Sequence, residues 1–207
     1  MKALAENPRV RGMVEERVKE FREVHLMDSR RWFEELVYCL LTAYSSALMG
    51  QRCVDALRCN DVLMMGELSD VRSCLSMQGH RFADIRAEYI YRSRGLAAEI
   101  KSIIQGFGNT ADARNWLVGN VKGLGWKEAS HYLRNVGYFD VAIIDRHILR
   151  NMAEHGIISA EDEKRSLTRK RYLAYEATLA KVAERVGMSL GEMDLYLWYR
   201  KTGKVLK

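Results

Sequence analysis

Lys127 and Asp145 are the two residues of this sequence whose positions best suit chemistry. Lys127 falls in the first turn of a predicted helix, two residues after a tight turn that ends at Gly125. The helix dipole disfavours a cation at this end and so favours the neutral amine. A neutral lysine amine is a nucleophile that forms a Schiff base with an electrophilic carbon such as C1′ of a sugar. Lys127 is therefore a candidate nucleophile.

Asp145 ends the apolar run 141–144 and precedes a helical pattern, which predicts that it caps that helix. Capping alone explains most aspartates in such a position. The same helix N-terminus also keeps the carboxylate ionised. An ionised carboxylate could stabilise positive charge as a glycosidic bond breaks, or it could accept the proton of the lysine. The sequence leaves both roles open.

The turn before Lys127 reads Lys122-Gly123-Leu124-Gly125 and joins two predicted helices. Glycine tolerates positive φ and leaves backbone N–H groups uncovered, so this spacing predicts a tight hairpin. Those groups and the free donors of the next helix form a site for a phosphate oxygen. Such a helix-hairpin-helix holds a nucleic-acid backbone without reading its sequence. The formal net charge of +6 gives this prediction mild support.

The elements that position these residues are all predicted to be helices. The chain has 207 residues, a single proline and no strand-like alternation of apolar and polar residues. Asn7 and Pro8 predict the start of the first helix, and Ser189 and Glu192 predict a capping box for the last one. Between them we expect helices near 29–43, 45–58, 66–77, 80–94 and 96–106, a hairpin helix capped by Asn109, and a long helix over 169–186.

The cysteines give no sign of a metal or redox site. All four lie in the first third of the chain, and their spacing fits neither a zinc ribbon nor a CxxC motif. We therefore expect buried free thiols at Cys39, Cys53, Cys59 and Cys74. No apolar run of about 18 residues is present, which predicts an intracellular protein without a membrane span.

Four segments carry a resemblance to a known family. The block GLGWKEASHYLRNVGYFDVAIIDRHILRN (123–151) and the tail DLYLWYRKTGKVLK (194–207) resemble the 8-oxoguanine DNA glycosylase/AP lyases of archaea and some thermophilic bacteria. The segments 79–90 and 41–47 also fit that family. The resemblance covers nearly the whole chain, and it includes the helix-hairpin-helix-plus-aspartate pattern of base-excision glycosylases.

The resemblance implies an all-α fold of two intimately packed helical domains, with the active site in the cleft between them. Residues 29–130 would form a helical barrel that ends in the helix-hairpin-helix. Residues 1–28 and 131–207 would form the second domain.

The resemblance also implies roles for individual residues. Lys127 matches the Schiff-base nucleophile and Asp145 the catalytic aspartate, while Gly123, Gly125 and His147 match positions that contact the DNA backbone. Further matching positions are the backbone carbonyls of Gly119, Val121 and Leu124 for a structural monovalent cation, the flat walls of a base pocket at Phe82 and Trp198, and the chain end Lys207 at the edge of the base.

Lys207 could contact the base through its side chain or through a terminal carboxylate. A carboxylate would accept a hydrogen bond from the N7–H that 8-oxoguanine has and guanine lacks. Two positions depart from the family pattern: Lys122 replaces a common proline, and Tyr44 replaces a small polar residue.

The sequence thus predicts a bifunctional enzyme that excises 8-oxoguanine and cleaves the abasic strand by β-elimination. Its partner would be double-stranded DNA containing 8-oxoguanine, and it would act as a monomer with no required cofactor. One alternative is an endonuclease III-like glycosylase for oxidised pyrimidines, although the absence of cysteine after Cys74 argues against the iron–sulfur cluster common there. Another is a non-catalytic DNA-binding module, and a third is a monofunctional glycosylase that uses water, against which Lys127 argues.

Overall fold

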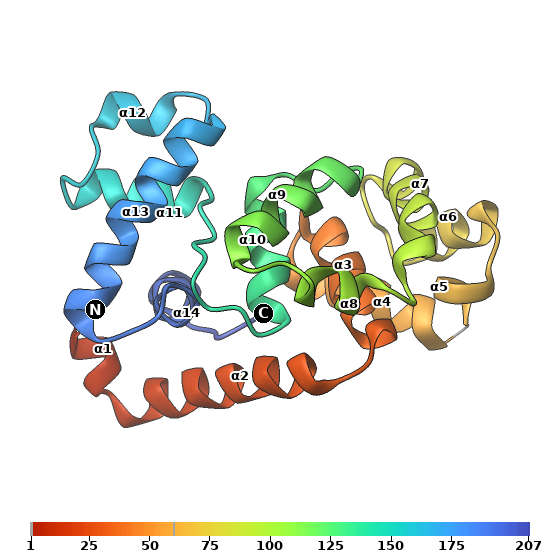
Figure 1. Ribbon diagram of the computed structural model, residues 1–207, viewed down its shortest axis with the longest axis horizontal. Helices are drawn as coiled ribbons and strands as arrows, with labels where there is room; N and C mark the ends of the chain where they lie inside the picture. Colours follow the sequence, from red (N-terminus) through yellow and green to blue (C-terminus); the bar gives the residue numbers. More distant parts are fainter. Residues whose placement is uncertain (1, 60) are drawn as a thin grey trace.

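The computed structural model describes residues 2–59 and 61–207, and within them the fold consists of helices without strands (Figure 1). The all-α prediction is confirmed. The α-helices are α1 (Lys2–Glu6), α2 (Pro8–Leu26), α3 (Ser29–Thr42), α4 (Ala47–Cys59), α5 (Val62–Met65), α6 (Leu68–Met77), α7 (Ala83–Ser93), α8 (Ile100–Gln105), α9 (Thr110–Asn120), α10 (Trp126–Asn135), α11 (Arg146–Glu154), α12 (Ala160–Lys164), α13 (Arg169–Val186) and α14 (Leu190–Thr202).

Helix α2 runs along one edge of the molecule and connects its two halves (Figure 1). It begins where predicted: Asn7 Oδ1 accepts hydrogen bonds from the backbone N–H groups of Arg9 and Val10, and Pro8 occupies the first helical position. The helix packs against α14, α3 and α10. The chain beginning is therefore built into the same body as the last helix.

The largest apolar core lies around α3, which is buried along almost its whole length. Helices α4, α6, α7, α9 and α10 contribute to this core, and it extends as far as Val141. A second core joins α11, α13 and α14, and a third joins α2 to α14. The predicted domain boundary at residue 130 falls inside α10, and buried residues on both sides of it belong to the first core. The two-domain division stays a prediction.

The long helices match their predicted ranges more closely than the short ones. Helix α13 spans the predicted 169–186, whereas α1, α5 and α12 have only four or five residues each and were not predicted. Helix α7 begins at Ala83 instead of residue 80 because the chain first makes a turn. In that turn, the His80 imidazole contacts the Leu41 carbonyl at 2.9 Å and accepts a hydrogen bond from the backbone N–H of Phe82.

Three of the four cysteines are buried free thiols, as predicted, but Cys59 is exposed at the end of α4. The prediction was wrong there because Cys59 lies on the outward side of the last helical turn. None of the described helices combines the length and the hydrophobicity that crossing a membrane requires.

Candidate active site

The hairpin between α9 and α10 has the tight turn that its sequence predicts. Helix α9 ends with a hydrogen bond from Val121 N to Leu117 O, and Leu124 N then donates to Val121 O. Gly123 has φ +89°, and a Cβ atom there would lie 2.2 Å from the Tyr89 ring. Only glycine fits this position because both the backbone angle and the neighbouring ring exclude a side chain.

Gly125 serves a different purpose from Gly123. Its φ of −89° is open to any residue, and it is the N-cap of α10 without a capping side chain. Within the described part of the chain, no partner is recorded for the backbone N–H groups of Trp126, Lys127 and Glu128. The first turn of α10 therefore presents free donors, as expected of an anion-binding helix end.

A surface hollow of about 520 Å³ lies against the hairpin and is lined by residues 118–125. The backbone of Gly119, Val121 and Leu124 borders it. The Val121 carbonyl already accepts one hydrogen bond from Leu124 N, which leaves its second lone pair. A monovalent cation held by these carbonyls stays a prediction.

Lys127 lies in the first turn of α10 and is partly exposed. The helix buries Ala129 and Leu133, and it also buries His131 and Arg134. Arg134 is buried because its guanidinium donates to Asp194 Oδ2 at 2.7 Å, across from α14. Helix α10 thus also buries polar and charged residues, which its own sequence does not reveal.

His131 follows Lys127 by one helical turn and is packed edge-on against the Tyr38 ring, with 5.7 Å between ring centroids. Burial, followed by the nearby charges of Arg134, Lys127 and Lys207, holds the pKa of His131 well below its usual value. The imidazole is therefore neutral, and its Nδ1 has no partner among the described residues.

Asp145 caps α11, as predicted: its Oδ1 accepts hydrogen bonds from the backbone N–H groups of His147 at 2.8 Å and Ile148 at 2.9 Å. For Oδ2, no hydrogen bond is recorded within the described residues. One oxygen of Asp145 therefore positions the carboxylate, and the other is available for chemistry.

Asp194 connects the lysine and the aspartate. Burial and the charge of Asp145 raise its pKa to about 6, while Arg134 and Lys127 act in the opposite direction. Lys127 and Asp145 are hence both near enough to this carboxylate to influence its ionisation, although they lie on different helices. The sequence did not predict Asp194, because its role depends on contacts with α10 and no local pattern points to it.

Trp198, a predicted base-pocket residue, lies next to the first turn of α11, the helix that Asp145 caps. The rings of His147 and Trp198 are 6.4 Å apart, which brings α14 against the start of α11. Trp198 is half-buried, with its Nε1 buried and unpartnered within the described chain. Phe82 lies at the start of α7, half-buried under the Arg81 guanidinium at 5.1 Å. Among the described residues, no ring contact joins Phe82 to Trp198.

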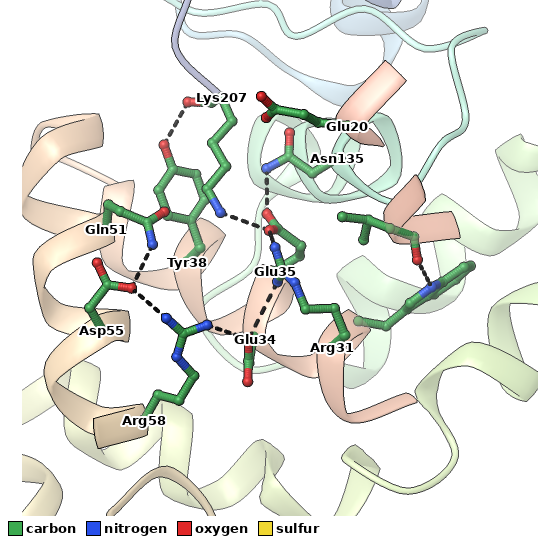
Figure 2. Close-up of polar contacts among 12 residues, drawn as sticks. Glu20, Arg31, Glu34, Glu35, Tyr38, Gln51, Asp55, Arg58, Asn135 and Lys207 are labelled. Carbon is green, nitrogen blue, oxygen red and sulfur yellow. Dashed lines mark hydrogen bonds and ion pairs between the residues drawn. The ribbon is translucent and has the colours of Figure 1, made fainter. Parts of the chain in front are cut away.

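Lys207 is partly buried and is held by contacts with α3 (Figure 2). Its Nζ donates to Glu35 Oε1 at 2.7 Å, and its main-chain oxygen accepts a 2.5 Å hydrogen bond from the Tyr38 hydroxyl. Glu35 also accepts hydrogen bonds from Arg31 and Asn135. Burial opposes the ionisation of Glu35, but Lys207 and Arg31 hold the pKa of its carboxyl below the usual value. The ammonium of Lys207 is therefore already paired within the protein.

Known proteins of similar sequence span the same length. The model of the 8-oxoguanine DNA glycosylase family matches residues 14–188. An 8-oxoguanine DNA glycosylase/AP lyase of Korarchaeum cryptofilum is 45% identical over 199 residues, which cover 96% of this chain and 92% of the relative. The corresponding protein of Methanocaldococcus jannaschii is 42% identical and covers 97% of this chain and 95% of its own length.

Solved structures agree with the sequence matches. The crystal structure of Methanocaldococcus jannaschii 8-oxoguanine DNA glycosylase has a TM-score of 0.92 at 42% identity, covering 100% of this chain and 94% of that one. A second structure from that organism, the 8-oxoguanine glycosylase/lyase in complex with a 15mer DNA containing 8-oxoguanine, also has a TM-score of 0.92, with 98% and 96% covered. With its fold, its hairpin and nearly its full length matched, the chain belongs to the 8-oxoguanine DNA glycosylase family.

Proposed function

We propose that this protein excises 8-oxoguanine from double-stranded DNA and cleaves the resulting abasic strand, with Lys127 as the Schiff-base nucleophile. The observation that carries the proposal is the position of Lys127 in the first turn of an uncapped helix, with Lys127 and Asp145 both near enough to the half-buried Asp194 to influence its pKa. The relatives named above as 8-oxoguanine DNA glycosylase/AP lyases support both activities. A binding module would need neither the lysine nor the aspartate.

The reaction begins with the DNA backbone bound at the hairpin. A phosphate oxygen accepts hydrogen bonds from the free N–H groups at the start of α10, favoured by the helix dipole. His147 contacts a second phosphate from the start of α11. The damaged nucleotide leaves the stack, at a cost of a few kcal/mol for unstacking, and enters the pocket.

Lys127 Nζ then attacks C1′ as the bond from C1′ to the base breaks and the base leaves with the electron pair. The free Oδ2 of Asp145 supports the positive charge on the sugar or takes the proton that the amine releases. The nitrogen lone pair then forms the C1′=N bond as the bond from C1′ to the ring oxygen O4′ breaks, and O4′ takes up a proton, which gives the protonated imine. Removal of a proton from C2′ then expels the 3′ phosphate by β-elimination, and hydrolysis of the imine releases Lys127.

The base pocket follows from the positions of the remaining predicted residues. Trp198 offers a flat face next to His147, and Phe82 would supply the opposite wall. The ammonium of Lys207 carries only donors and is paired with Glu35, so the main-chain oxygen of Lys207 accepts the N7–H of 8-oxoguanine beside the hydrogen bond that it accepts from Tyr38. We propose that the protein works as a monomer, that the hairpin carbonyls hold a monovalent cation, and that no cofactor takes part in the bond-breaking steps.

Borohydride trapping tests this function directly, since reduction of the imine joins the protein covalently to DNA. Duplexes carrying one 8-oxoguanine, one thymine glycol or no lesion are compared. Lys127→Gln is the test variant, and Lys122→Gln is its control because Lys122 is a lysine of the same hairpin. We expect an adduct with 8-oxoguanine only, lost in Lys127→Gln and retained in Lys122→Gln.

Other outcomes identify the alternatives. An adduct with thymine glycol alone would assign the protein to oxidised pyrimidines. Binding without an adduct on any duplex would disprove the lyase step, and release of the free base would then separate a monofunctional glycosylase from a non-catalytic module.

A further inference from the structure

The segment that leads to Asp145 is held in place by side chains instead of a backbone partner. Residues 141–145 belong to no helix, and no backbone–backbone hydrogen bond to residues 141–144 is recorded in the described chain. The side chains of Tyr172 and Glu176 on α13 form hydrogen bonds with the backbone groups of Ala142 and Ile144. The position of Asp145 therefore depends on α13.

The hydroxyl of Tyr172 is the centre of this arrangement. It donates to Ala142 O at 2.6 Å and accepts a hydrogen bond from Ile144 N at 3.2 Å. Tyr172 is fully buried, and burial raises the pKa of its hydroxyl, which keeps the proton that the bond to Ala142 needs. One residue of α13 thus fixes two backbone groups just before Asp145.

The same hydroxyl reaches the helix that carries Lys127. Its oxygen lies 3.0 Å from Oγ of Ser130 on α10, and it accepts the serine proton because its own proton goes to Ala142 O. The carbonyl oxygen of Trp126, the residue before Lys127, also lies 3.0 Å from this Oγ. A short chain of hydrogen bonds, from the backbone of Ala142 and Ile144 through Tyr172 to Ser130, therefore connects the segment before Asp145 with the helix that carries Lys127.

The ion pair between Arg114 and Glu176 contacts this chain of hydrogen bonds at both ends. Glu176, one helical turn after Tyr172, accepts a hydrogen bond from Ala142 N at 2.8 Å and pairs bidentately with Arg114 at 2.5 and 2.6 Å. Arg114 is only 2% exposed and also donates to Ser130 Oγ. Bidentate geometry restricts both partners, so the pair fixes α9 and α13 relative to each other.

We infer that Tyr172 is a positioning residue for the reaction: its hydroxyl sets the place of Asp145 relative to Lys127. This inference rests on the proposed function, because it assigns Tyr172 to the same two residues. Misplacement of a catalytic group by about 1 Å can cost on the order of 10²-fold in rate. Tyr172 touches neither DNA nor base in this role, and it acts through the segment 142–145.

Tyr172→Phe tests the inference, because it removes the hydroxyl and keeps the ring. The matched control is Tyr132→Phe, since Tyr132 is also fully buried and its hydroxyl has no partner among the described residues. Single-turnover base excision and duplex affinity are measured well below the melting temperature of each variant. For Tyr172→Phe we expect excision to slow by about tenfold or more, with the duplex Kd and KM within about threefold of wild type. Tyr132→Phe should keep the wild-type rate.

The pH profile of the excision rate separates positioning from general destabilisation. Displacement of the Asp145 carboxylate should change the shape of the profile in Tyr172→Phe, whereas a protein that is only less stable keeps the wild-type profile. If Tyr172→Phe does not fold, Ser130→Ala breaks the same chain with a smaller change, and the same rate loss at unchanged KM is expected.

The inference is overturned by a wild-type rate in folded Tyr172→Phe, by an equal loss in Tyr132→Phe, or by an unchanged pH profile. Its failure differs from failure of the proposed function. If only the role of Tyr172 is wrong, wild-type protein still forms the Lys127 adduct. If the proposed function is wrong, wild-type protein forms no adduct.

Discussion

The ammonium of Lys207 lies 2.7 Å from Oε1 of Glu35, a carboxylate that precedes it by 172 residues and is only 1% exposed (Figure 2). Asn135 of α10 and Arg31 of α3 donate to the same carboxylate. Three donors around one buried anion satisfy it and keep it charged. Lys207 is thereby fixed against α3 and linked through Glu35 to α10, the helix that carries Lys127.

Replacing Glu35 with Gln should release Lys207. The neutral amide loses the charge that holds the ammonium, and we expect stability to fall by about 2 kcal/mol as buried donors lose their partner. Digestion of the folded 207-residue chain with carboxypeptidase B, followed by mass spectrometry, should remove Lys207 several-fold faster from the variant. Glu34→Gln is the control, because Glu34 pairs with Arg31 but has no contact with Lys207. Equal digestion of both variants would show that Glu35 does not hold the tail.

Gly123→Ala should damage the hairpin. Alanine costs roughly 1–2 kcal/mol at positive φ, and its Cβ would meet the Tyr89 ring at 2.2 Å, so we expect a total loss above about 2 kcal/mol and weaker binding to any duplex. Gly119→Ala is the control, since a Cβ there meets nothing within 4 Å and alanine favours the helix by about 1 kcal/mol. The free energy of unfolding in urea and the duplex affinity are measured for both variants and for wild type. A Gly123→Ala variant as stable as wild type would contradict the turn geometry.

The sequence predicted those parts of the fold that have strong local signals. Asn7, Asn109 and Asp145 cap helices as expected because an N-cap is formed by residues next to each other in the chain. Helices of four or five residues were missed because they are too short to show a 3.6-residue period.

The sequence predicted only those site residues whose positions are defined by their neighbours in the chain. Lys127 and Asp145 stand beside a hairpin and a cap that their own neighbours define. Asp194, Glu35 and Tyr172 take part through contacts with helices far away in sequence, and nothing in their local pattern separates them from ordinary helical residues. Burial of charged residues on α3 and α10 follows from these long-range partners.

Tyr44 should be a site where substitution raises stability. It has φ +60°, is 88% exposed, and lies in a turn held by the Arg86 guanidinium on the carbonyl of Ala43. Asparagine tolerates this backbone region better than tyrosine, so Tyr44→Asn should gain about 1 kcal/mol in urea unfolding. Tyr91→Asn, in the helical backbone of α7, should lose stability instead. A loss in both variants would mean that the Tyr44 backbone is not strained.

Asp194 should give the protein a distinct pH dependence. Its pKa is raised from 3.8 to about 6 in the folded state, mainly by burial and then by Asp145. Between these two values the folded state binds more protons than the unfolded state, so the contribution of this group to the free energy of unfolding is fully present below 3.8. It is lost as the pH rises through 6, and the total change is about 3 kcal/mol.

Comparison with Asp194→Asn isolates this contribution, because asparagine does not titrate. The pKa of His131 is lowered, so that residue gives the opposite slope, with stability lost as the pH falls below 6.5, but it does so in both proteins and cancels in the difference. Urea unfolding of both proteins from pH 4 to pH 7 should therefore show wild type losing about 2.5 kcal/mol relative to the variant, because the unfolded aspartate is already half ionised at pH 4. Parallel curves would mean that Asp194 ionises at the same pH in the folded and unfolded chain, and that it is not buried beside Asp145.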